Sequence, residues 1–408
     1  MKQIISAEYV TLGHPDRLCD TIAANLINRI QRKDGPSSHA AVEVFASDDT
    51  VVFGGEVTTT LKINKKLLKD VLAESFNDCG YFPSRRENFS KPEVYLAKDT
   101  KIINKIHSQS PDIALGTTDK KEDAGFNDQG IFFGAYDGTT KTGQGYAKYI
   151  AQAFGDFLFN ETFTEKTFGS DIKTVVTIEV EKDGITPSEI KHITIAIPHV
   201  KEVGQDYCLA YVKTKWKEFA KKEVDKDIKI DNIQFTVNGT GRYVSHGYHS
   251  DASMTGRKLA VNNMGAGPVS SQCQCGGGSY IKPWHASDLL LPKTGDWIAK
   301  AIVDMKLSKY ANVALACSIG SHSLDSFEIT GDSKFMKSKE IELIEKFFRE
   351  EFEWTPKNIV INYWDSTFFN SNLMYFAQKS NFVNVTLPWY NTSKLIDDIK
   401  RYIEKVGK

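Results

Sequence analysis

The chain lacks the long apolar run that a membrane helix needs and the excess of one charge that draws a protein to nucleic acid. Its 408 residues include 51 lysines and arginines against 52 aspartates and glutamates, which gives a net charge of −1. No stretch of about 18 apolar residues occurs, and the first ten residues do not read as a signal peptide. We therefore expect neither a membrane nor a nucleic-acid partner, and any bound anion must be held by locally placed cations.

Cysteine is also scarce, because the six residues at 19, 79, 208, 273, 275 and 317 form no compact framework. A chain of this length buries a sizeable core without disulfides. The distribution predicts reduced thiols and a cytoplasmic protein. Cys273 and Cys275 with His285 lack a fourth ligand at ordinary spacing, which argues against zinc.

Hydrophobic spacing predicts alternating helices and strands. A helix is expected over 18–30, with Pro15 at its first position and His14 near its N-cap. Strands are expected at 40–46 and 50–60, and two more flank the turn at 182–184. Further helices are expected at 64–81, 144–159, 206–225, 295–307, 338–352 and 393–406. The order has no strict βαβ rhythm, so we predict an α+β fold rather than a doubly wound parallel sheet.

The stretch GHPDRLCD at 13–20 places a histidine and two carboxylates at the start of the first helix. A helix N-terminus carries unpaired N–H groups and a partial positive charge, which attract anions. His14 would donate to such an anion, whereas Asp16 would repel it unless Mg²⁺ bridged the two. The alternative is an ordinary helix cap with a solvated aspartate.

Two pairs of charged residues lie in or beside predicted strands. Glu43 and Glu56 either face solvent or are paired with a cation or a substrate ammonium group. Asp171 and Lys173 share one face at the start of a strand. They form either a surface ion pair or contacts to a ribose hydroxyl and a phosphate.

The segment NGTGRYVSHGYHSDASMTGRK at 238–258 is the densest in chemically active residues. Its glycines let backbone N–H groups approach an anion, Arg257 and Lys258 add adjacent positive charges, and Tyr243 could stack on a base. Neither Walker A nor GxGxxG spacing is present, so a nucleotide would be bound by other means. A turn without a ligand is the alternative.

Two further loops are candidates. Residues 273–288 combine three successive glycines with Lys282, which suits an anion, and Asp288, which suits a metal. Residues 107–130 form a long polar stretch, and loops of this length are usually either functional or disordered.

Eight segments occur in the order seen in S-adenosylmethionine synthetases, which the chain resembles from about residue 6 to 395. They are GHPDR, GGEVTT, QSPDI, NDQGIFFG, TGRYV, DASMTGRK, GGGSYIK and FVNVTLPW. In that family the sulfur of methionine attacks C5′ of ATP, and the expelled triphosphate is hydrolysed to pyrophosphate and phosphate. The resemblance implies three similar α+β domains with mixed or antiparallel sheets, which we place at 1–112, 113–245 and 246–408. It also implies Mg²⁺ and K⁺ as cofactors, and a homodimer or homotetramer with active sites between subunits.

The resemblance also assigns residues. The ATP positions are His14, Asp171, Lys173, Arg242, Tyr243, Asp251, Arg257, Lys258, Ser279 and Lys282; four of them, His14, Lys173, Arg257 and Lys258, are expected to act in catalysis. The methionine positions are Glu56, Gln109, Asp251 and Ile319. Asp16 and Asp288 are expected to hold Mg²⁺ and Glu43 to hold K⁺. Residues from Gln109 to about Asp119 correspond to a loop that gates the site.

The chain departs from the family pattern at several positions. Tyr243 stands where the family usually has phenylalanine, and Ala286 stands where it has a lysine. Two other hypotheses therefore remain open. One is a non-catalytic paralogue that binds nucleotide, and the other is a related ATP-dependent transferase that uses another thioether.

Overall fold

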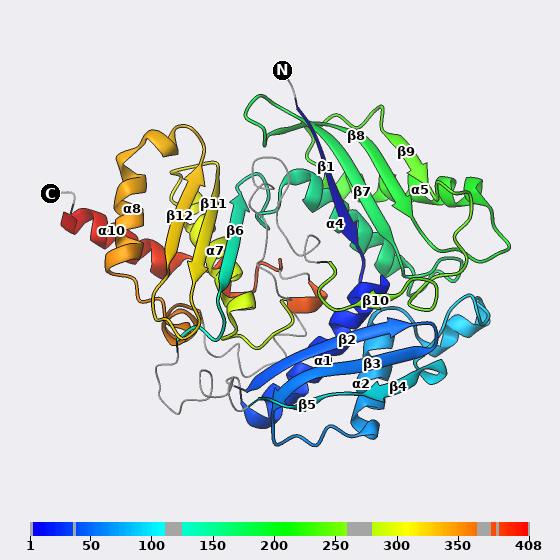
Figure 1. Cartoon of the computed structure of the whole chain (residues 1–408). Coiled ribbons are helices and arrows are strands. Elements are labelled where there is room, and N and C mark those ends of the chain that lie inside the picture. Colours follow the sequence, from blue (N-terminus) through cyan, green and yellow to red (C-terminus); the bar gives the residue numbers. More distant parts are fainter. Residues whose placement is uncertain are drawn as a thin grey trace.

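The computed structural model describes residues 3–35, 38–110, 125–258, 280–364, 377–380 and 383–406. In these ranges three sheets surround a common centre, and each packs against helices of its own (Figure 1). The predicted α+β class with mixed and antiparallel sheets is confirmed. None of the helices in this part of the chain is long and apolar enough to cross a bilayer.

Each sheet is built on an antiparallel hairpin. One sheet contains β2 (His39–Ser47), β3 (Thr50–Thr58), β4 (Lys101–Asn104), β5 (His107–Ser108) and β10 (Ser253–Met254). The second contains β1 (Gln3–Val10), β7 (Lys173–Val180), β8 (Pro187–Ala196) and β9 (Gln234–Val237). The third contains β6 (Gly130–Asp137), β11 (Tyr310–Cys317) and β12 (Ser326–Gly331).

The sheets exchange strands. β1 pairs antiparallel with β7, β6 with β11, and β10 with β2, so each sheet is completed by a strand from another part of the chain. The chain passes three times through strand, helix and hairpin, as β1–α1–β2–β3, β6–α4–β7–β8 and β10–α7–β11–β12. This repeat supports the expectation of three similar units, while the domain boundaries given above remain a prediction.

The long helices follow the predicted segments. They are α1 (Pro15–Asp34), α2 (Lys65–Asp78), α4 (Tyr146–Glu161), α5 (Gln205–Glu223), α7 (Ser287–Asp304), α8 (Lys339–Glu350) and α10 (Ser393–Val406). Helix α7 begins earlier than the expected residue 295 and runs through Pro292, because the fully buried leucines at 289–291 hold its first turns in place. Short 3-10 turns lie at Pro83–Glu87, Ala97–Asp99, Phe335–Lys337 and Pro388–Tyr390, and a π turn at Asn358–Tyr363.

The start of α1 is fastened to the segment that leads into β7. A Cβ on Gly13 would lie 2.1 Å from the carbonyl oxygen of Ser170, so only glycine allows this approach. The hydroxyl of Thr11 donates to the same carbonyl oxygen at 2.7 Å. This contact places His14 next to Asp171.

Candidate active site

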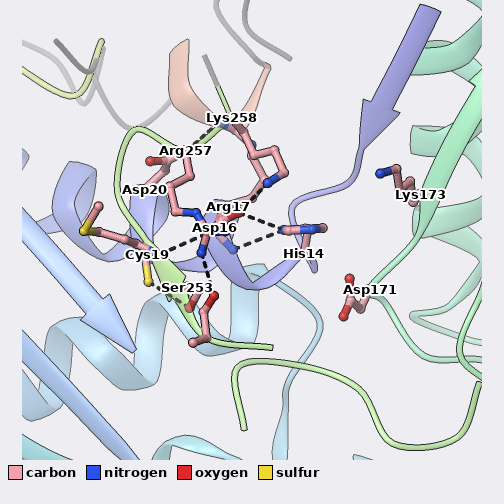
Figure 2. A network of polar contacts seen from close by, with 12 residues as sticks. His14, Asp16, Arg17, Cys19, Asp20, Asp171, Lys173, Ser253, Arg257 and Lys258 are labelled. Atoms are coloured by element: carbon pink, nitrogen blue, oxygen red, sulfur yellow. Dashed lines mark hydrogen bonds and ion pairs between the residues drawn. The ribbon is translucent and has the colours of Figure 1, made fainter. Parts of the chain in front are cut away.

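Three segments that are distant in sequence meet at one place, as Figure 2 shows. They are the first turn of α1, the start of β7 and the segment that follows β10. Two groups of side chains are defined here and kept below. The His14 cluster is His14, Asp16, Arg257 and Lys258, and the Asp288 cluster is Glu43, Asp128, Lys282 and Asp288.

Asp16 is the centre of the His14 cluster. It is 1% exposed, and its Oδ1 accepts a hydrogen bond from the backbone N–H of Met254 at 3.0 Å. Its Oδ2 is paired with the ammonium group of Lys258, and Nη1 of Arg257 lies 3.6 Å from Oδ1. The carboxylate is therefore neutralised by cations from the segment after β10.

His14 is confirmed as the N-cap of α1, because its Nδ1 accepts a hydrogen bond from the N–H of Asp16 at 3.1 Å. In a neutral ring the proton then resides on Nε2. Burial, and then the positive charge of Lys258, lowers the pKa of His14 to about 3, and Lys173 acts in the same direction. The ring is neutral at pH 7 and offers its Nε2–H as a donor to an oxygen atom.

A buried polar network beneath the His14 cluster was not predicted from the sequence. The carboxylate of Asp20 accepts from the N–H of Gly256 at 3.0 Å and from Nη1 of Arg17 at 3.0 Å. Nη2 of Arg17 donates to Oε1 of Gln378 at 2.6 Å. Burial raises the pKa of Asp20 to about 6, although Arg17 opposes this shift. The network connects the segment after β10, at Gly256, to α1. Arg17 and Asp20 belong to the opening motif and could have been found there, whereas Gln378 carries no sequence signal.

Asp171 and Lys173 do not form the ion pair that the sequence left open. Lys173 is paired instead with Glu8 at 3.0 Å, where both side chains are nearly half exposed. Asp171 accepts from the hydroxyl of Tyr243 at 2.7 Å. Burial raises the pKa of Asp171 to about 7, and the negative charge of Asp251 adds to the shift. Asp171 and Lys173 therefore act separately at the start of β7.

The Asp288 cluster carries three carboxylates against one lysine. Burial raises the pKa of Asp288; the charge of Lys282 opposes this, and the charges of Asp128 and Glu43 add to it. Glu43 also accepts a hydrogen bond from the hydroxyl of Thr255, a residue that the sequence did not single out. Since Thr255 lies just before Arg257 and Lys258, Glu43 connects the two clusters.

The expected methionine positions lie in separate places. The backbone N–H of Gln109 donates to the carbonyl of Val57 at 3.2 Å, and its Oε1 accepts from the hydroxyl of Thr58 at 3.0 Å, whereas Glu56 pairs with His107. Asp251 lies beside Asp171, and Ile319 is exposed after β11. No hydrogen bond or ion pair within the described ranges joins Glu56 or Gln109 to Asp251 or Ile319.

Some expected residues are exposed or fall outside the described residues. The side chain of Arg242 is exposed. Ser279, Cys273, Cys275 and the gating-loop residues from 111 onward lie outside the described residues. Within the ranges that are described, no group of three or more His, Cys, Asp or Glu residues is placed to hold a metal ion. A Mg²⁺ ion here would need phosphate oxygens beside one or two protein carboxylates, which is its usual environment with nucleotides.

A neutral imidazole donor, paired cations and separate carboxylates suit a polyphosphate bound together with metal ions. Residues 2–111 match the N-terminal domain of S-adenosylmethionine synthetase, and residues 245–390 match its C-terminal domain. The S-adenosylmethionine synthase of Acholeplasma laidlawii is 30% identical over 371 residues, which cover 89% of this chain and 90% of that protein. That of Fusobacterium nucleatum is 28% identical over 98% of both chains. The chain belongs to the S-adenosylmethionine synthetase family.

The fold agrees with this assignment. The structure of an unusual S-adenosylmethionine synthetase from Campylobacter jejuni matches with a TM-score of 0.83 and covers 98% of this chain and 99% of that one. Its sequence is 24% identical, so the match establishes a common fold.

Proposed function

We propose that this chain makes S-adenosylmethionine from ATP and L-methionine. The observation that carries the proposal is the His14 cluster, in which an imidazole, an ammonium group and a guanidinium group from distant segments surround one buried carboxylate. The reaction is inferred from membership of the family. The His14 cluster adds cations and a hydrogen-bond donor that could bind a triphosphate.

The reaction needs no nucleophile from the protein, because the thioether sulfur of methionine is itself the nucleophile. The sulfur forms a bond to C5′ while the C5′–O bond breaks and its electron pair stays on the leaving triphosphate. The protein must align the reactants and stabilise the charge that develops on that oxygen. The Nε2–H of His14 and the cations Lys173, Arg257 and Lys258 would do so. Water then cleaves the triphosphate to pyrophosphate and phosphate.

Asp16 and Asp288 would hold Mg²⁺ and Glu43 would hold K⁺. Bound Mg²⁺ would neutralise phosphate charge and orient the leaving group. In the Asp288 cluster, burial and the charges of Asp128 and Glu43 raise the pKa of Asp288 while Lys282 opposes the shift, so a bound cation would offset the negative charge around Asp288. In the His14 cluster Lys258 is paired with Asp16 and would have to move to a phosphate oxygen before Asp16 could meet a metal.

We also infer a homodimer or homotetramer. Phe45, Ile103 and Met254 lie on the outer face of the five-stranded sheet and are 45%, 43% and 44% exposed. Met254 pairs with Phe45, and Ile103 pairs with Val52, which in turn pairs with Phe45, so all three point to the same side. A second subunit on this face would cover the apolar residues and bring Glu56 into a shared site. Light scattering after size exclusion should give at least twice the monomer mass, and a monomer at micromolar concentration would contradict the inference.

The direct test is an assay of the purified full chain with ATP, methionine, Mg²⁺ and K⁺, with products identified by mass spectrometry. We expect S-adenosylmethionine, pyrophosphate and phosphate in equal amounts, and no product when Mg²⁺ is omitted. Failure to form S-adenosylmethionine under every combination of these ions would refute the proposal.

One observation favours a second candidate, a nucleotide-binding paralogue without catalysis. Ala286 is the N-cap of α7, is buried, and makes no side-chain cap hydrogen bond. The family pattern has a lysine at this position, so a cation is missing close to Asp288. Calorimetric binding of ATP together with no turnover would select this candidate.

A further inference from the structure

The backbone of Tyr243 is held rigidly by His199. The N–H of Tyr243 donates to Nε2 of His199 at 3.1 Å, and the N–H of His199 donates to the carbonyl of Tyr243 at 2.8 Å. Nδ1 of His199 lies 2.9 Å from the carbonyl oxygen of Val200, so Nδ1 carries the proton and Nε2 is the acceptor. His199 is itself buried, so its hydrogen bonds to the backbone of Tyr243 are shielded from water.

The side chain of Tyr243 is hydrogen-bonded to only one of the two carboxylate oxygens of Asp171. Its hydroxyl donates to Oδ2 at 2.7 Å, and the N–H of Gly247 donates to the same oxygen at 3.2 Å. No residue of the described ranges donates a hydrogen bond to Oδ1. Asp171 is 5% exposed overall, but its Oδ1 is not among the fully buried side-chain atoms that lack a partner, so this oxygen remains accessible to solvent or to a ligand. Burial also raises the pKa of Asp171 to about 7, although the hydrogen bonds from Tyr243 and Gly247 oppose the shift.

We infer that Tyr243 is a positioning residue whose hydroxyl turns the second oxygen of Asp171 toward the ribose hydroxyls of ATP. The inference rests on the proposed function and adds a selectivity to it. A site built to bind a hydroxyl group rejects an analogue that lacks it, because its acceptor is left unpaired. Phenylalanine, which the family usually has at this position, would keep the aromatic ring but lack the hydroxyl that orients Asp171.

The test compares ATP with 2′,3′-dideoxy-ATP by calorimetry, with Mg²⁺ present and methionine absent, so that no turnover is needed. We expect the native chain to prefer ATP by about 10-fold, the effect of one hydrogen bond to a charged group. In Tyr243→Phe the preference should fall to about 3-fold, because Asp171 is less firmly oriented. Tyr248→Phe is the matched control, since its buried hydroxyl is bonded to that of Thr100 at 2.7 Å. It should keep the native preference.

The outcomes separate positioning from packing. If Tyr243→Phe weakens the binding of both nucleotides equally, so that the ratio of their affinities is unchanged, Tyr243 has only a structural role. The inference is then overturned, while the proposed function stands. If the native chain binds neither nucleotide, the proposed function fails and the inference falls with it. A reduced ratio in Tyr243→Phe with a native ratio in Tyr248→Phe supports it.

Discussion

The His14 cluster and the Asp288 cluster differ in how their charges are compensated. In the first, buried Asp16 has a backbone donor from Met254 and the cations Lys258 and Arg257. In the second, Asp288 has one opposing lysine and two further carboxylates nearby. The charges of the first cluster are therefore compensated within the protein, whereas the second keeps an excess of negative charge among the residues that the structure describes.

Because of this difference, we expect substitutions in the two clusters to have different effects on protein stability and on ligand binding. In a compensated cluster, removing one member leaves another buried charge unpaired, which destabilises the folded protein. An uncompensated cluster gains from a cation, so removing one of its carboxylates relieves repulsion. Changes in the His14 cluster should then affect the folded protein and the chemical step, and changes in the Asp288 cluster mainly ligand affinity.

The largest expected effect is on turnover. His14→Ala should lower kcat by about 100-fold, because it removes a fixed donor to the leaving group. Lys282→Ala should lower kcat/KM by only about 10-fold and act mainly through the KM for ATP, since it removes a charge rather than an oriented hydrogen bond. Steady-state kinetics on both variants check this. Near-native turnover in His14→Ala would remove His14 from the mechanism and erase the distinction between the clusters.

The local part of this organisation could be predicted from the sequence. The N-cap at His14, the hairpin of β2 and β3 and most helices depend on neighbouring residues, and the structure confirms them. Hydrophobic periodicity shows which face of a strand is buried but not which strand lies beside it. The pairing of β1 with β7, which brings Val10 opposite Lys173, therefore could not be foreseen from periodicity.

The rest of the candidate site could not be predicted from the sequence for the same reason. The motif resemblance grouped Asp16 with Lys258, but only the structure shows them as an ion pair. The hydrogen bond from Arg17 to Gln378 joins residues 361 positions apart, and glutamine has no pattern that marks it as a partner. Long-range polar contacts depend on the packing of the elements that carry them, and no local rule encodes that packing.

The second-largest effect is expected on the free energy of unfolding, which should change differently for the two clusters. Asp16→Asn should lower the free energy of unfolding by about 2–3 kcal/mol, because Lys258 loses its buried partner. Asp288→Asn should leave it unchanged or raise it by up to about 1 kcal/mol, because it removes repulsion with Asp128 and Glu43. Urea unfolding at pH 7 without nucleotide or metal measures both. Equal losses in the two variants would show that their charges are compensated alike.

The clusters should also respond to acid in opposite directions. His14 has its pKa lowered to about 3 by burial, so the unfolded chain binds a proton first as pH falls below about 6.5, and stability is lost. Asp288 has a raised pKa, so the folded chain binds its proton first and gains stability as pH falls toward the ordinary carboxyl range. Unfolding at pH 7 and pH 5 should show that His14→Gln removes roughly 1–2 kcal/mol of the native acid loss. Asp288→Asn should instead deepen that loss, and a His14→Gln profile parallel to the native one would contradict the neutral ring.

The smallest effect is expected for Glu8→Gln, which removes the partner of Lys173 at the start of β7. Glu8 is nearly half exposed and lies 3.0 Å from Lys173, so Glu8→Gln should change the free energy of unfolding by less than about 0.5 kcal/mol. The same change should lower the KM for ATP by no more than about 2-fold, because Lys173 no longer has to leave a carboxylate to reach a phosphate. Lys173→Met breaks the same pair from the other side and should be equally stable yet clearly slower. If instead Lys173→Met kept native turnover, Lys173 would have no part in catalysis and would belong to the protein surface alone.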